Sequence, residues 1–138
     1  MQLQHGCGRR WLRPAVIVVF SALVTLAIAA CGGNGGGGSS YKEPSGPAQT
    51  TLDIKGGNFF FDPKEPSVPA GIVAIKLEST EGLHTLVFDD GKLPGFKLEA
   101  ASGKSDELKA DLKPGRYTFF CDIPGHREGG MEGTLTVT

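Results

Sequence analysis

The stretch CDIPGHREGGM, residues 121–131, carries three side chains that can bind soft or borderline metals. They are the thiol of Cys121, the imidazole of His126 and the thioether of Met131, with four residues between each and the next. The preceding GRYTFF at 115–120 is aromatic and β-prone, and the following GTLTVT at 133–138 alternates with period two. The pattern predicts a ligand-bearing loop that joins two strands at one end of a sheet.

A thiolate and an imidazole with a weak axial thioether belong to the ligand set of a blue-copper site, which requires a second histidine. His84, within LHTLVF at 83–88, is the only other histidine beyond residue 30 and is the predicted second imidazole. Each side chain also has an ordinary interpretation: His84, Cys121 and Met131 could be core residues, and His126 could lie in a solvated turn. Their combination in one register favours the copper site.

The chain resembles the cupredoxins, the small blue-copper proteins that include plastocyanin, azurin, rusticyanin and auracyanin. The similarity covers residues 51–138, and its most specific parts are YTFFC at 117–121 and PGH at 124–126. The even ligand spacing is most similar to auracyanin and rusticyanin. The resemblance implies an all-β fold, an antiparallel Greek-key β-sandwich, and a one-electron carrier. It implies one type 1 copper per chain, with the ligands His84, Cys121, His126 and Met131. The sequence offers no substrate-pocket signature, no second copper set and no general base near a nucleophile, so the chain is not expected to be an enzyme.

Two residues beside the ligands are predicted to tune the copper by hydrogen bonds to the Cys121 sulfur. Thr85 stands where cupredoxins commonly have Asn, so its backbone N–H can reach the sulfur while its side-chain link between the two loops differs. Ile123 keeps an N–H where plastocyanin has Pro, which predicts a second bond to the sulfur. Around His126, the expected electron port, an apolar docking patch is expected, although the same residues could be core. Its candidates are Ile123, Pro124, Leu93, Pro94 and Phe96.

The N-terminal thirty residues are predicted to be an export signal, because three arginines precede an apolar run at 15–30. The ending IAAC at 28–31 resembles a bacterial lipobox, in which Cys31 is joined to diacylglycerol and becomes the new N-terminus; a plain secretory signal is the alternative. Residues 31–50 are rich in Gly, Ser and Pro, which predicts a flexible tether. The domain at 51–138 would then be anchored outside the cytoplasm to a bacterial cell membrane.

The cysteine inventory supports a metal at Cys121. Cys7 would leave with the signal and Cys31 would be lipidated, which leaves Cys121 without a disulfide partner. An unpaired thiol in an exported protein is prone to oxidation unless something binds it. Copper ligation would account for its presence.

Short alternating runs separated by turn residues predict an antiparallel sandwich for the folded part. The Gly56-Gly57-Asn58 segment is expected to form a turn after the first strand. Leu93 to Ala101 is expected to be a loop with a short helical turn. The expected strands are residues 51–55, 72–79, 83–88, 102–112, 115–120 and 133–138.

The net charge of the chain indicates which kinds of partner it can bind. The chain has 14 basic and 15 acidic residues; removing the three arginines of the predicted signal leaves 11 against 15, or −4. A mildly acidic chain argues against nucleic acid as a partner, since phosphate binding needs a basic face. The protein is expected to be a monomer whose partners are redox proteins of the cell envelope. The alternatives are a protein that binds and delivers copper to envelope enzymes, and an interaction domain on a degenerate cupredoxin scaffold.

Overall fold

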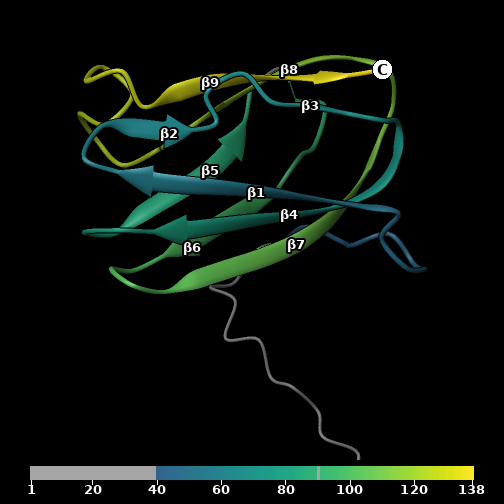
Figure 1. Ribbon diagram of the computed structural model, residues 1–138, viewed down its shortest axis with the longest axis horizontal. Helices are drawn as coiled ribbons and strands as arrows, with labels where there is room; N and C mark the ends of the chain where they lie inside the picture. Colours follow the sequence, from purple (N-terminus) through teal and green to yellow (C-terminus); the bar gives the residue numbers. More distant parts are fainter. Residues whose placement is uncertain (1–39, 90) are drawn as a thin grey trace, which may run out of the picture. The chain divides into compact units, whose positions relative to one another are not determined.

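The computed structural model describes residues 40–89 and 91–138, in which nine strands form two facing sheets (Figure 1). The sheets have the strand orders β2-β1-β4-β7 and β3-β9-β8-β5-β6. The predicted all-β sandwich is therefore confirmed, whereas the predicted signal and lipidated Cys31 lie outside the described residues. The strands are β1 (Thr50–Gly57), β2 (Phe60–Asp62), β3 (Ser67–Val68), β4 (Gly71–Ser79), β5 (His84–Phe88), β6 (Lys97–Ala100), β7 (Ser105–Leu112), β8 (Gly115–Phe120) and β9 (Glu132–Val137).

Two strand pairs are parallel, so the sheets are mixed and not purely antiparallel. β1 runs parallel to β4, and the short β3 runs parallel to β9. A parallel pair needs a crossover connection. Here the chain leaves the first sheet after β2, contributes β3 to the second sheet and returns as β4. The other pairs are antiparallel, as predicted.

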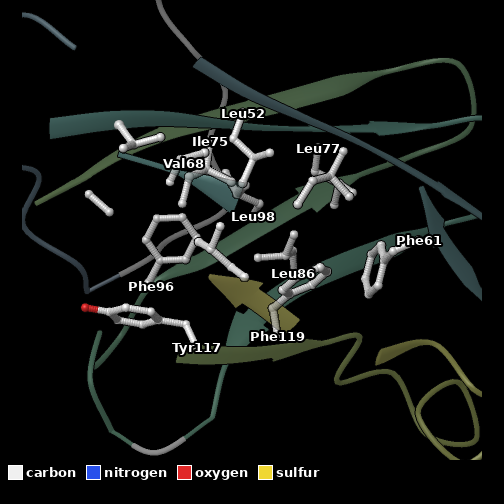
Figure 2. Packing of buried hydrophobic residues seen from close by; sticks show 14 of the residues in the cluster. Leu52, Phe61, Val68, Ile75, Leu77, Leu86, Phe96, Leu98, Tyr117 and Phe119 are labelled. Carbon is white, nitrogen blue, oxygen red and sulfur yellow. The ribbon is translucent and has the colours of Figure 1, made fainter. Parts of the chain in front are cut away.

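The core lies between the sheets, where inward-facing side chains of alternate positions meet (Figure 2). On β4 the predicted inward set, Val73, Ile75 and Leu77, is buried. From the second sheet, Leu86 on β5 and Phe119 on β8 are both fully buried. Successive side chains of a strand point to opposite faces, so residues two apart share a face. Leu86 and Phe119 therefore orient the residues two positions away, His84 and Cys121, toward the interior.

Two local predictions were wrong. The segment predicted as a loop with a helical turn contains strand β6, which pairs with β5 from Lys97 opposite Val87 to Ala100 opposite His84. Its alternation spans only four residues, too few to stand out beside Pro94 and Gly95 in the sequence. The predicted glycine turn also begins later, because Gly56 and Gly57 belong to β1 and the turn falls at 58–59.

Residues 41–49, which the sequence assigns to the flexible tether, pack against the sandwich. The ring of Tyr41 contacts the ring of Phe96 edge to face, with centroids 5.1 Å apart. The Glu43 carboxylate accepts a hydrogen bond from the backbone N–H of Lys109 on the edge strand β7, at 3.1 Å. The N–H of Gln49 donates to a β4 carbonyl at 2.7 Å. The packed part thus begins before residue 51. Across the described part of the chain, no helix is long and apolar enough to pass through a bilayer.

Candidate metal centre

Strand β5 begins and strand β8 ends at the same end of the sandwich (Figure 1). The predicted ligands gather there. His84 is the first residue of β5, and Cys121 directly follows β8. His126 and Met131 lie in the loop from β8 to β9. Because strands β5 and β8 are neighbours in one sheet, segments far apart in sequence converge there.

The structure brings His84, Cys121 and His126 close enough to share one metal ion. Their ligand atoms all lie within 4.8 Å of one another. The Cys121 Sγ is 3.5 Å from Nδ1 of His126, and the two imidazole rings have centroids 5.2 Å apart. His84 is 3% exposed and Cys121 is fully buried, whereas His126 is half-buried. The centre is therefore buried at His84 and Cys121 and more accessible at His126.

His84 supplies an independent sign of a missing partner. Both of its ring nitrogens are buried and have no hydrogen-bond partner among the described residues. A buried polar atom without a partner is costly, so such atoms usually have a ligand in the functional state. Burial lowers the pKa of His84, and the adjacent His126 adds to this, whereas the backbone and the carboxylate of Glu81 act in the opposite direction, although neither forms a hydrogen bond with the ring. The neutral ring that results is the form that binds metals.

Met131 is fully buried at the same place and lies beside His84. Gly56 on β1 makes room for both: a Cβ added there would lie 3.2 Å from Met131 Cε and 3.5 Å from His84 Cβ. The thioether is thus enclosed at the base of the centre by a strand of the opposite sheet. The role of Gly56 beside the centre was not predicted, because a glycine in the sequence does not reveal which side chains pack against it.

The ligand loop is folded by its own backbone. The Cys121 N–H donates to the Met131 carbonyl at 3.1 Å, and the Met131 N–H donates to the His126 carbonyl at 3.0 Å. The His126 N–H donates to the carbonyl of Ile123 at 3.0 Å. These bonds tie the three ligand-bearing residues of the loop to one another, so a metal would enter a site whose backbone is already arranged.

Thr85 contacts the Cys121 sulfur in two ways. Its backbone N–H donates to Sγ at 3.4 Å, and its hydroxyl oxygen lies at the same distance from Sγ. The second backbone bond, predicted from Ile123, is not found among the described residues. Ile123 instead begins a turn, in which its carbonyl accepts a hydrogen bond from the His126 N–H.

Asp122 and Lys97 join this group, and sequence analysis missed both. The Thr85 hydroxyl donates to Oδ1 of Asp122 at 2.7 Å and accepts from the Asp122 N–H at 3.0 Å. Lys97 Nζ lies 3.0 Å from Oδ2 of Asp122. Burial alone would raise the pKa of Asp122, but the Thr85 hydrogen bond and the Lys97 ammonium outweigh it, and the pKa is lowered. Asp122 is next to a ligand in sequence, whereas nothing in the sequence marks Lys97.

The surroundings of His126 differ from the predicted docking patch. Phe96 is 2% exposed and packs against Phe88, at the end of β5 opposite His84, so it is not part of a surface around His126. The turn that contains Leu93 and Pro94 connects β5 to β6 at that same remote end. Of the five candidates, Ile123 and Pro124 remain near the centre.

A surface hollow of about 490 Å³ lies over the centre instead. It is lined by Asn58, Glu81, Gly82, Leu83, His84, Ile123 and His126. Leu83 is 48% exposed. Phe59, 43% exposed, meets the His126 ring edge to face with centroids 5.3 Å apart. The apolar surroundings of His126 therefore come from Phe59, Leu83 and Ile123.

Comparison with known proteins agrees with this geometry. Residues 48–138 match the family model described as copper binding proteins, plastocyanin/azurin family. Plastocyanin of Scenedesmus fuscus is 32% identical over 95 residues, which cover 62% of this chain and 94% of that protein. Chloroplastic plastocyanin of Physcomitrium patens is 32% identical over 90 residues, which cover 59% of this chain and 52% of that protein.

Solved auracyanin structures share the fold. Auracyanin of Roseiflexus castenholzii has a TM-score of 0.54 and 27% identity, and the match covers 67% of this chain and 99% of that one. Auracyanin B has a TM-score of 0.57 at 22% identity, covering 73% of this chain and 96% of that one. The cofactor predicted from the ligand loop, copper, is the metal of the matched family. The chain thus belongs to the plastocyanin/azurin family of copper-binding proteins.

Proposed function

We propose that the protein is a membrane-tethered carrier of single electrons between redox proteins of the bacterial cell envelope. In this proposal His84, Cys121, His126 and Met131 hold one type 1 copper, and a lipid on Cys31 anchors the chain. The observation that carries the proposal is His84, whose two buried ring nitrogens have no partner among the described residues and whose ligand atom lies within 4.8 Å of a thiol and a second imidazole. A donor set of one thiolate and two imidazoles suits copper.

The chain's residues suit electron transfer more than exchange of the metal. Bound copper supplies a one-electron couple. Cys121 and Met131 are fully buried and His84 nearly so, which excludes water and competing ligands. The backbone bonds of the loop hold Cys121, His126 and Met131 together. A preformed site of this kind moves little when its charge changes, which favours fast transfer.

His126 is the proposed electron port. It is half-buried, lines the surface hollow and contacts the exposed ring of Phe59. Leu83 and Ile123 complete an apolar rim around it. A partner that covers this rim would bring its own cofactor close to the His126 edge and exclude water between them. We therefore take the docking face to be Phe59, Leu83, Ile123 and His126.

The first experiment is a visible absorption and EPR spectrum of the full-length protein in detergent, loaded with copper(II) and titrated with a reductant. An intense blue band with narrow copper hyperfine splitting, bleached and restored reversibly, is expected. A colourless protein that binds copper(I) and yields it to a modest chelator would reject the carrier and favour copper delivery.

Replacement of Ile123 by Glu tests the docking face. The variant should keep the blue band, because the Ile123 side chain is not a ligand, but should exchange electrons more slowly with a redox partner. Thr51→Glu is the control, since it adds the same charge on an exposed position of β1. Equal rates for the wild type and Ile123→Glu would show that partners dock elsewhere.

A further inference from the structure

Thr85 and Asp122 form a side-chain link where the backbone pairing of β5 and β8 has ended. The ladder pairs Phe88 with Phe119 and Val87 with Phe120, its last pair toward the metal centre. Continuing that register by two residues places Thr85 opposite Asp122. The two residues directly after the ligands His84 and Cys121 are thus joined by side-chain hydrogen bonds of 2.7 and 3.0 Å.

The Thr85 hydroxyl has two possible acceptors but only one proton. Asp122 Oδ1 lies 2.7 Å from Oγ1, whereas the Cys121 sulfur lies 3.4 Å from it. The Asp122 N–H occupies an acceptor site of the same hydroxyl. A short bond to an ionised carboxylate is among the strong hydrogen bonds of proteins, so the proton goes to Asp122. Of the two Thr85 contacts, the sulfur then keeps only the hydrogen bond from the backbone N–H.

Lys97 holds Asp122 in the position that accepts this proton. Its Nζ lies 3.2 Å from Oδ1 and 3.0 Å from Oδ2 of the carboxylate. Lys97 comes from β6, so the link joins a third strand to the two that carry ligands. The pair is partly exposed, with side chains 40% and 37% accessible, and its Coulomb energy is correspondingly small. Its role is geometric.

We propose that Asp122, positioned by Lys97, withdraws the Thr85 hydroxyl proton from the Cys121 sulfur and thereby lowers the reduction potential of the bound copper. A hydrogen bond to a thiolate reduces the electron density that the sulfur gives the metal, and oxidised copper needs that density more than reduced copper does. Withholding one such bond favours the oxidised state. The inference rests on the proposed electron-transfer function and names residues that would set its potential.

Reduction potentials of four full-length proteins test the proposal: wild type, Thr85→Val, Asp122→Ala and the double variant. Thr85→Val alone should change the copper(I)/copper(II) equilibrium ratio less than about threefold, because the hydroxyl does not bond the sulfur. Asp122→Ala frees the hydroxyl for the sulfur and also removes a negative charge, and both raise the potential. The Thr85→Val background retains only the charge effect. Asp122→Ala should therefore raise the potential more when Thr85 is present than when Val replaces it. The difference between the two shifts should be about tenfold in the copper(I)/copper(II) equilibrium ratio, or about 59 mV for one electron.

The thiolate-to-copper absorption band gives a second readout. An added hydrogen bond stabilises the sulfur electrons, so Asp122→Ala and, to a lesser extent, Lys97→Met should move the band to higher energy only when Thr85 is present. Lys97→Arg should restore the original position. Lys113→Met is the matched control, because it breaks another exposed Lys–Asp pair, with Asp111 at 2.9 Å. Equal shifts of potential or band in the Thr85 and Val backgrounds would overturn the proposal.

A metal-free measurement separates this inference from the proposed function. In the copper-free protein, Thr85→Val and Asp122→Ala should be non-additive by at least about threefold in the unfolding equilibrium constant, because they remove one shared link. Additive effects would show that the link is absent. A colourless protein with non-additive stabilities would reject the proposed function and keep the link, whereas a blue protein with equal potential shifts would reject the tuning role alone.

Discussion

Substitution of Gly56 by Ala tests whether β1 sets the position of the Met131 thioether. The backbone at Gly56 is not left-handed, so alanine introduces no conformational strain there. The new Cβ would lie 3.2 Å from Met131 Cε and 3.5 Å from His84 Cβ. Carbon atoms pack best at about 3.5–4.0 Å, so the Met131 methyl group must retreat by about 0.3–0.8 Å. Met side chains adapt readily, which makes such a retreat feasible.

The cost in stability should be small and the effect on copper should be visible. Overpacking a core typically costs about 1–3 kcal/mol, and Ala in place of Gly in a strand returns about 0.5–1 kcal/mol. The free energy of unfolding of the metal-free protein should therefore fall by about 0–2.5 kcal/mol. The copper(II)-loaded variant should show altered hyperfine splitting and band intensities, since the thioether is displaced relative to the other ligands.

Chemical denaturation of the metal-free protein and EPR of the copper-loaded protein measure the two effects. Gly57→Ala is the matched control on the same strand. Its Cβ would meet the half-exposed ring of Phe60, which can swing into solvent, and the hydroxyl of Thr80, and none of these nearest atoms belongs to a predicted ligand. That variant should leave the copper spectrum unchanged. An unchanged spectrum in Gly56→Ala would refute the reasoning, as would a stability loss above about 4 kcal/mol, which indicates a rearranged core.

Two further predictions concern stability. In the metal-free protein, the pKa of His84 is lowered in the folded state. Stability is therefore fully present above the unfolded pKa of about 6.5 and is lost as pH falls through the folded pKa. Denaturation measured between pH 8 and 5 should show this fall in the free energy of unfolding, and a fall that persists in His84→Gln would contradict its assignment to His84. Tyr41→Ala should lower the free energy of unfolding by about 1–3 kcal/mol, since the edge-to-face contact with Phe96 is lost. The matched control is Lys42→Ala at the next, exposed position, and equal stabilities of the two variants would mean that the Tyr41 ring contact contributes nothing to stability.

The ligand loop and the inward faces of the strands could be predicted from the sequence because each depends on local spacing. Val73, Ile75 and Leu77 alternate, and alternation alone fixes one face of a strand. The parallel pairing of β1 and β4 could not be predicted in this way, since it depends on the chain crossing to the other sheet through β3.

The failures at the turn and in the surroundings of the centre have physical causes as well. Phe59 adopts a left-handed conformation, φ 61°, at a place where the sequence suggested that glycines would form the turn. A bulky residue rarely adopts this conformation, and its ring packs against His126 and beside Gly129. Lys97 contacts Asp122, and Gly56 lies beside Met131, each from a strand distant in sequence. Contacts of this kind depend on register between strands, which residue types alone do not reveal.

The packing of residues 41–49 has a consequence for the direction in which the protein faces. Ser40 and Tyr41 lie beside Gly95, in the turn at the Phe88 end of β5, whereas His84 begins the same strand at the metal end. Those ends are about 13 Å apart along the strand. In the proposed tethered protein, an anchor on the N-terminal side of Ser40 would therefore pull on the end of the sandwich opposite the metal centre. A redox partner could then approach His126 without competing with the anchor.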